Sequence, residues 1–358
     1  MSHLESTKKM LPEGTALLVT SAINQRWLTG FDYTDGYVLV THGESFLITD
    51  FRYVEAARAE ADPGFTVFMP EGISMLTAIG EMLADEKVTR VMVEDETLSI
   101  ANFEFYKEKF PGIGFVTGGS ALLDGLREFK DAGEIENMKR AQDIADAAFT
   151  HILGYINPDR TEIDVALELE FFMRSHGAEA EAFQTIAVSG SASSKPHGVP
   201  RPVKLEKGFL TMDFGARYKG YCSDMTRTVV IGKADAEMKR LYNTVLKAQL
   251  TVIEALEAGE RGCRKLDSIA RDIIDGTEGY TGAFGHSLGH GVGMYIHENP
   301  RLSKAAAEDA VLKVGQVFTD EPGIYLSGKY GCRIEDMLTL TESGLLNFAH
   351  SPKELIEL

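Results

Sequence analysis

The sequence predicts a mixed α/β protein with two domains, and three observations support this prediction. The chain has 358 residues, more than a single hydrophobic core usually organises. Short apolar runs alternate with amphipathic segments over the first third of the chain. Beyond that third, long amphipathic segments are separated by pairs of short apolar runs. We therefore expect a small domain at residues 1–125 and a larger domain at residues 126–358.

The small domain is expected to combine strands with helices. Four short apolar runs bounded by turn residues predict strands at residues 14–21, 37–42, 44–50 and 90–96. Two segments with apolar residues at helical spacing predict helices at residues 53–61 and 74–86. No charged cluster in this domain has the pattern of a chemical site, so the second domain is expected to carry the chemistry.

A long amphipathic helix is expected to open the second domain. Asp131 is a suitable N-terminal cap, and Glu134 follows it at the spacing of a capping box. Apolar residues then recur every three or four positions as far as Ile152. Three further helices are expected at residues 161–177, 234–256 and 263–277, with pairs of strands between them.

Charge and composition exclude several classes of function. Lys and Arg number 36 and Asp and Glu number 54, so the formal charge is −18, which argues against nucleic acid and anionic membranes as partners. No run approaches the roughly 18 apolar residues of a membrane span. The opening residues MSHLESTKKM lack the hydrophobic core of a signal peptide, so a cytoplasmic location is expected. The three cysteines form no CxxC pair, so neither a disulfide framework nor a zinc finger is indicated.

Four carboxylates and one imidazole stand out in short apolar segments of the second domain: Asp213, Asp224, His290, Glu321 and Glu335. Carboxylates in such surroundings are costly to bury unless a positive charge compensates them. A pair of divalent metal ions would do so, and such a pair makes a nucleophile from water at neutral pH. Oxygen-rich ligation with one imidazole suits Mn, Co, Fe or Zn better than Ca.

The spacing of the carboxylates is consistent with two antiparallel hairpins. A turn at Tyr218-Lys219 would place Asp213 directly opposite Asp224. A loop centred on Gly328 would place the second pair, Glu321 and Glu335, opposite each other in the same way. Facing carboxylates repel unless a cation lies between them. Two such pairs would suit two ions about 3.5–4 Å apart.

Three more histidines and one arginine are candidates for contacting a substrate. His197 lies in a loop rich in Gly, Pro and Ser, while His286 and His297 flank the candidate ligand histidine. Each is either a packed, hydrogen-bonded imidazole or a donor to a substrate carbonyl and its oxyanion. Arg333 shares a strand face with Glu335, so it either forms an ion pair with a glutamate or binds a substrate carboxylate.

These segments also resemble those of a known family. The matching segments are RWLTGF, SGSASSKPHGVP, DFGARYKGYCSDMTRT, HSLGHGVGMYIHENP, EPGIY and RIED. In order and spacing they resemble the creatinase/aminopeptidase or "pita-bread" metallopeptidases, family M24, specifically the Xaa-Pro branch. The resemblance covers nearly the whole chain. It implies a creatinase-like N-terminal α/β domain and a C-terminal pita-bread domain, in which helices cover a curved antiparallel sheet.

The resemblance implies a metal-binding role for each of the five candidate ligands. Asp224 and Glu335 would bridge two divalent ions, Mn or Co being favoured and Zn or Fe also compatible. Asp213 would complete one ion's shell, while His290 and Glu321 would complete the other. A bridging water would attack the scissile carbonyl carbon. Glu321 would take the proton from this water and pass it to the leaving nitrogen.

The remaining candidates would handle the substrate. By the same resemblance, His197 and His297 would bind the carbonyl region and stabilise the tetrahedral intermediate. His286 and Arg333 would line the pocket and assist proton relay or substrate anchoring. Short proline-containing peptides would be the substrates, and a homodimer would be the usual assembly.

The expected activity is hydrolysis of the bond between an N-terminal residue and proline. The compact length slightly favours an Xaa-Pro dipeptidase over an aminopeptidase P, which acts on longer peptides. Three alternatives remain: a methionine aminopeptidase-like hydrolase, a metal-free creatinase-like hydrolase, and a non-enzymatic pita-bread binding protein. The N-terminal domain argues against the first, and the complete ligand set argues against the other two.

Overall fold

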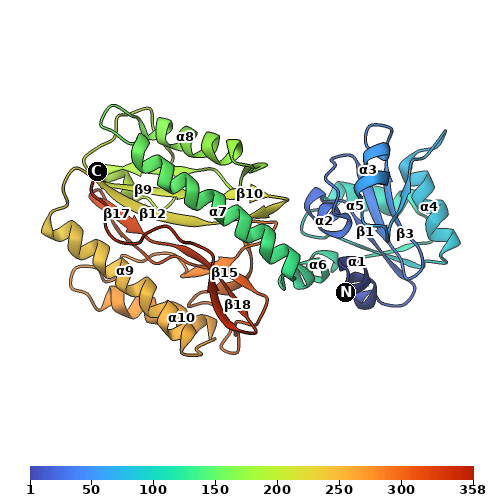
Figure 1. Cartoon of the computed structure of the whole chain (residues 1–358). Helices are drawn as coiled ribbons and strands as arrows, with labels where there is room; N and C mark the ends of the chain where they lie inside the picture. The colour runs from blue at the N-terminus through green and yellow to red at the C-terminus, as the bar shows by residue number, and fades with distance from the viewer. The chain divides into compact units, whose positions relative to one another are not determined.

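The computed structural model describes residues 1–358 and divides into two compact units, Met1–Arg127 and Glu128–Leu358. Figure 1 shows the helices and strands of both units. None of the helices combines the length and the apolar character that crossing a bilayer requires.

The first unit is built on a six-stranded mixed sheet in the order β4-β3-β2-β1-β5-β6. Its strands are β1 (Thr15–Val19), β2 (Gly36–Val40), β3 (Ser45–Thr49), β4 (Thr66–Phe68), β5 (Arg90–Val93) and β6 (Gly114–Val116). Its helices are α1 (His3–Met10), α2 (Ala22–Thr29), α3 (Val54–Glu60), α4 (Met75–Asp85), α5 (Ile100–Lys109) and α6 (Gly119–Arg127). The expected strands β1, β2, β3 and β5 and the expected helices α3 and α4 are confirmed.

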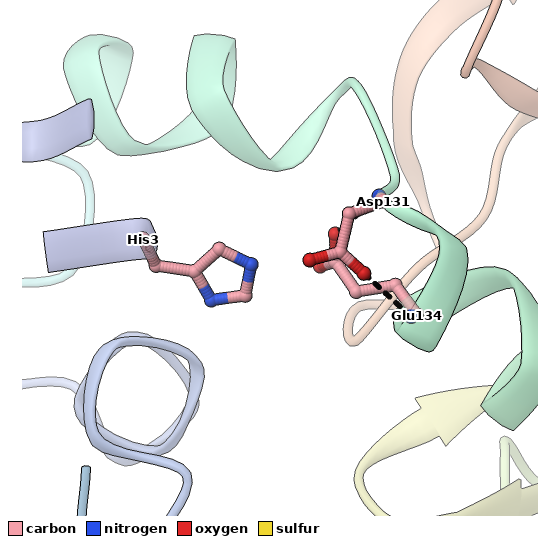
Figure 2. A group of neighbouring side chains, drawn as sticks. All are labelled: His3, Asp131 and Glu134. Atoms are coloured by element: carbon pink, nitrogen blue, oxygen red, sulfur yellow. Dashed lines mark hydrogen bonds between the residues drawn. The ribbon is translucent and has the colours of Figure 1, made fainter. Parts of the chain in front are cut away.

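The second unit opens with the long helix α7 (Ala132–Tyr155), whose expected start is confirmed. The carboxylate of Asp131 accepts hydrogen bonds from the amides of Gly133 and Glu134 at 2.8 and 2.9 Å. The side chain of Glu134 accepts one from the Asp131 amide at 2.8 Å, which completes the capping box. Figure 2 shows these two acidic side chains at the first turn of the helix.

Three more helices complete the helical part of this unit: α8 (Glu162–Ser175), α9 (Ala236–Glu257) and α10 (Cys263–Asp275). In Figure 1 the strands of the unit lie between α7 and α8 on one side and α9 and α10 on the other. Two apolar cores follow this division, one under each pair of helices.

The strands of the second unit pair with one another in antiparallel fashion and form four small sheets. One sheet contains β8 (Ile186–Ser189), β9 (Gly208–Phe214) and β12 (Met225–Ile231). A second contains β7 (Ala180–Glu181), β10 (Ala216–Tyr218) and β11 (Tyr221–Cys222). The largest contains β13 (Gly289–Gly291), β14 (Glu298–Leu302), β15 (Val317–Asp320), β18 (Asp336–Thr341) and β19 (Gly344–Asn347). The last pairs β16 (Gly323–Leu326) with β17 (Tyr330–Arg333).

The register expected for the first hairpin is wrong by two residues. Thr226, and not Asp224, lies opposite Asp213. The turn falls at Lys219 and Gly220, whose φ angles are +47° and +85°. A two-residue hairpin turn of this kind needs positive φ at both central positions, which glycine adopts without strain. A shift of two keeps both aspartates on one face of the sheet, but they are diagonal neighbours.

The register expected for the second hairpin is confirmed on both sides of its two glutamates. Asp320 pairs with Asp336 at the end of β15 and the start of β18. Gly323 pairs with Arg333 at the start of β16 and the end of β17. Both pairs follow the register in which the glutamates between them face each other.

Candidate metal centre

A cavity of about 360 Å³ lies in the second unit. All nine residues singled out from the sequence line it: Asp213, Asp224, His290, Glu321, Glu335, His197, His286, His297 and Arg333. They come from segments up to about 140 residues apart in the sequence, which the antiparallel sheets bring to one place.

Three of the candidate ligands form the tightest group. Asp224, His290 and Glu335 are all buried, and one ligand atom from each lies within 4.8 Å of the other two. The Nε2 atom of the imidazole is 3.5 Å from Oδ2 of Asp224 and 3.4 Å from Oε1 of Glu321. One nitrogen thus faces two carboxylates, a set of donor atoms that suits a divalent cation.

The backbone fixes the orientation of His290. Its Nδ1 donates to the carbonyl of Gly291 at 2.9 Å, so the lone pair is on Nε2, the atom that faces the carboxylates. Burial lowers the pKa of this histidine to about 3, so the ring is neutral. A neutral imidazole held through its other nitrogen is the usual form of a metal-binding histidine.

The carboxylates are held in surroundings that oppose their charge. Burial raises the pKa of Asp224 and of Glu335 well above their usual ranges, and the neighbouring carboxylates raise both further. Burial also raises the pKa of Glu321 to about 8. Oδ1 of Asp213 is buried and accepts no hydrogen bond from the protein. Divalent cations would relieve all of these costs, so the donor set fits a metal centre.

Two threonines orient the glutamates, and sequence reasoning missed both. The hydroxyl of Thr226 donates to Oε2 of Glu335 at 2.6 Å. The hydroxyl of Thr319 lies 3.3 Å from Oε1 of Glu321 and accepts from the amide of His290 at 3.1 Å. Strand alternation places Thr319 on the same face as the glutamate two residues later. That alternation was the available signal.

Arg333 is buried and forms an ion pair with Asp213. Its Nη2 is 2.5 Å from Oδ2 of Asp213, and its Nε donates to Oγ1 of Thr226 at 2.9 Å. Its Nη1 donates to the hydroxyl of Tyr325 at 2.7 Å, and that hydroxyl lies 3.0 Å from Nε2 of His286. Of the two roles considered for this arginine, the structure shows an ion pair, although its partner is an aspartate and not a glutamate.

The other histidines line the cavity in different ways. The ring of His297 packs edge-on against His290, with centroids 4.4 Å apart. Burial, and then the charge of Arg301, lowers its pKa. His197 is exposed in the loop between β8 and β9.

Arg301 was also missed by sequence reasoning. It lies opposite His290 across β13 and β14 and lines the cavity. Apolar side chains also line the cavity: Phe183, Ile186, Pro196, Val199, Pro200 and Ile296.

Comparison with known proteins matches each of the two units to a protein family. Residues 136–342 match Metallopeptidase family M24, and residues 13–129 match the Creatinase/Prolidase N-terminal domain. The chain is 36% identical over 358 residues to an Xaa-Pro dipeptidase of Pyrococcus furiosus, covering 99% of both proteins. It superposes on an Xaa-Pro dipeptidase from Bacillus anthracis with a TM-score of 0.92 and 39% identity, covering 99% of both chains. An X-Pro aminopeptidase from Thermotoga maritima gives a TM-score of 0.90 and 35% identity, covering 96% and 97% of the two chains.

Proposed function

Because this chain belongs to metallopeptidase family M24, we propose that it is an exopeptidase that hydrolyses the bond between an N-terminal residue and proline. Its fold joins a creatinase-like N-terminal domain to a pita-bread domain, as expected. The observation that carries the proposal is the buried group of Asp224, His290 and Glu335, which lines a small cavity. Relatives that match over the full chain carry the name Xaa-Pro dipeptidase.

The metal assignment in this proposal is a centre of two divalent ions. Asp224 and Glu335 would be held in common by the ions, Asp213 would bind one of them, and His290 and Glu321 would bind the other. The buried Oδ1 of Asp213, which lacks a protein donor, and the lone pair on Nε2 of His290, which faces two carboxylates, support this assignment. Mn or Co is the proposed metal, and Zn or Fe also suits these donors. Bound ions polarise the scissile carbonyl and lower the pKa of water towards about 7.

The side chains around the centre bind the substrate and move the proton. Glu321 accepts a proton from the attacking water and passes it to the leaving proline nitrogen. Its Oε1 lies 3.4 Å from Nε2 of His290, so this carboxylate is close enough to the centre to take up that proton. His197 and His297 donate to the substrate carbonyl and to the oxyanion that develops from it. His286 lies 3.8 Å from Glu321 and supports the relay.

The cavity favours a dipeptide over a longer peptide. A volume of about 360 Å³ is at the small end of ligand sites. An Xaa-Pro dipeptide carries its carboxylate on the proline, one residue beyond the scissile bond. The guanidinium of Arg301 at the cavity wall is suited to bind that carboxylate, and the apolar lining residues suit the proline ring.

Hydrolysis of Ala-Pro and Ala-Pro-Ala in Mn²⁺ or Co²⁺ tests the proposal. We expect Ala-Pro to be cleaved faster than the tripeptide. Release of Met from Met-Ala-Ser, with Ala-Pro untouched, would favour a methionine aminopeptidase instead. A purified protein that neither binds metal nor gains activity on adding these ions would contradict the enzyme assignment.

We further propose that residues 1–125 and 126–358 are the two functional domains. The division of the chain after Arg127 supports a boundary close to this point. We also propose a cytoplasmic location and a homodimer, the assembly that the family resemblance implies. Light scattering coupled to gel filtration tests the assembly.

A further inference from the structure

Glu162, in the first turn of α8, is fully buried and lies outside the cavity lining. Its carboxylate accepts five hydrogen bonds from only two residues. Ser189 donates from its amide at 2.7 Å and from its hydroxyl at 2.8 Å. Arg201 donates from its amide at 2.9 Å and from Nε and Nη2 at 2.8 and 2.6 Å. So many donors on one buried carboxylate fix the backbone of both partners.

The two partners of Glu162 are the two ends of one loop. Ser189 is the last residue of β8, and Arg201 follows the loop of residues 190–200. Five consecutive loop residues, Pro196 to Pro200, line the cavity. The carboxylate therefore ties together the beginning and the end of a loop that forms one cavity wall.

The first part of the loop, Gly190–Ser194, is a 3-10 turn that packs against β17 and β9, and two hydrogen bonds also join the loop to the rest of the unit. The amide of Gly331 donates to Oγ of Ser193 at 3.0 Å. The carbonyl of Pro196 accepts from Arg333 at 3.3 Å. His197 itself is exposed. The position of its imidazole thus depends on the backbone of the loop, which the two ends control.

The guanidinium of Arg201 is the part of this arrangement that a substitution can remove. The side chain of Arg201 is 36% exposed, whereas that of Glu162 is 0% exposed. Removing the guanidinium would leave a buried carboxylate without its positive partner, although the three donors from Ser189 and the arginine backbone would remain. The loop ends would then loosen while the rest of the unit keeps its contacts.

We propose that Glu162 and Arg201 are positioning residues that hold the 190–200 loop, and with it His197, against the cavity. The consequence for catalysis rests on the proposed function, in which this imidazole donates to the substrate carbonyl. Neither of the two positioning residues contacts the substrate; they act through the loop.

Hydrogen exchange of the backbone amides tests the structural half of the proposal. We expect Arg201→Met to increase exchange in residues 190–200 and to leave the helices of the second unit protected. The matched control is Lys204→Met, which removes an exposed ion pair to Asp159 at 2.7 Å in the same segment. This control should leave exchange in the loop unchanged. Arg201→Lys keeps the charge but not the forked contact, so it should lie between Met and wild type.

Kinetics and metal content test the functional half. We expect Arg201→Met to lower kcat/KM on Ala-Pro between about tenfold and about a hundredfold, because small displacements of a catalytic group have effects of this size. Bound Mn²⁺ per chain should stay unchanged, since no metal-binding residue is altered. Lys204→Met should match wild type in both measurements.

Two results would overturn the proposal. One is unchanged exchange in residues 190–200 of Arg201→Met, and the other is an increase spread evenly over the second unit, which would mark a general support of the fold. If the wild-type protein does not cleave Ala-Pro, the proposed function fails, but the exchange comparison still decides whether Glu162 and Arg201 hold the loop.

Discussion

The hydroxyl of Thr226 donates to Oε2 of Glu335 at 2.6 Å, and the backbone amide of that glutamate donates back to the Thr226 carbonyl at 3.1 Å. The same hydroxyl accepts from Nε of Arg333 at 2.9 Å. One threonine therefore fixes both the main chain and the side chain of the glutamate that we propose as a bridging ligand. Hydrogen bonds to a ligand from outside the metal shell set its orientation.

We predict that Thr226→Val weakens Mn²⁺ binding by about ten- to a hundredfold, because the valine keeps the volume but loses the donor to Glu335. Isothermal titration of the metal-free protein measures this. Thr228→Val is the matched control, since this buried hydroxyl on the same strand donates to the Arg333 carbonyl at 2.9 Å and not to a ligand. Equal affinity in both variants would mean that the hydroxyl does not orient the ligand.

Loss of a shared ligand, Asp224 or Glu335, should reduce activity more than loss of the substrate-binding His297. We predict that Asp224→Ala and Glu335→Ala reduce Ala-Pro hydrolysis to background, since each removes a carboxylate from both ions. His297→Ala should lower kcat by roughly 10²–10³-fold, as expected for the loss of one oxyanion donor. Steady-state kinetics at saturating Mn²⁺ compares the three. Turnover that survives in Glu335→Ala would show that the bridging assignment is wrong.

The candidate ligands could be recognised from the sequence because carboxylates in apolar strands are costly and therefore conspicuous. Their pairing could be derived only where the turn was assigned correctly. The register on either side of Glu321 and Glu335 is the expected one, but the pairing of Asp213 was misjudged because the positive φ of Lys219 and Gly220 moves the turn by one position.

Thr226 and Arg301 show what sequence reasoning could not supply. In the sequence each has the pattern of an ordinary strand residue. The register of the sheets then shows that Thr226 lies opposite Asp213 and that Arg301 lies opposite His290. The missed strands β4 and β6 have three residues each, too few for a two-residue alternation to be recognised.

The stability of the metal-free protein should fall as the pH rises through neutrality. Burial raises the pKa of Glu321 from its usual 4.5 to about 8, so between these values the folded state keeps a proton that the unfolded chain has lost. Buried His290 acts in the opposite direction, but only below its usual pKa of 6.5. The fall is therefore clearest from pH 6.5 to about pH 8, where this one glutamate contributes about 2 kcal/mol.

Urea unfolding of EDTA-treated protein across this pH range measures the effect. Protein loaded with Mn²⁺ should lose the slope, because bound cations keep the carboxylates ionised in the folded state. Glu321→Gln should also flatten the slope in the metal-free protein. A stripped wild-type protein whose stability is constant from pH 6.5 to pH 8 would contradict the prediction.

Arg301 should determine the preference for a free carboxylate. We predict that Arg301→Ala raises KM for Ala-Pro by roughly ten- to a hundredfold, the value of one charge-assisted hydrogen bond, while kcat changes little. The neutral substrate Ala-Pro-amide is the control, and its KM should be the same for variant and wild type. An equal rise in KM for both substrates would show that Arg301 does not bind the substrate carboxylate.

The close approach of two strands beside His290 leads to a stability prediction. A Cβ atom on Gly289 would lie 2.0 Å from the carbonyl oxygen of Thr319 in the neighbouring strand, so backbone would have to move. A Cβ on Gly285, four residues earlier, would meet no atom within 4 Å. We therefore predict that Gly289→Ala destabilises the protein by about 1–3 kcal/mol or more, whereas Gly285→Ala has almost no effect.

Thermal unfolding followed by circular dichroism compares these two glycine variants. Because β13 carries the imidazole ligand, Gly289→Ala should also weaken Mn²⁺ binding, and Gly285→Ala should not. A Gly289→Ala protein as stable as wild type would show that β13 and β15 can separate without loss. Normal stability with weakened metal binding would instead show that the strand shifts locally and carries His290 away from the carboxylates.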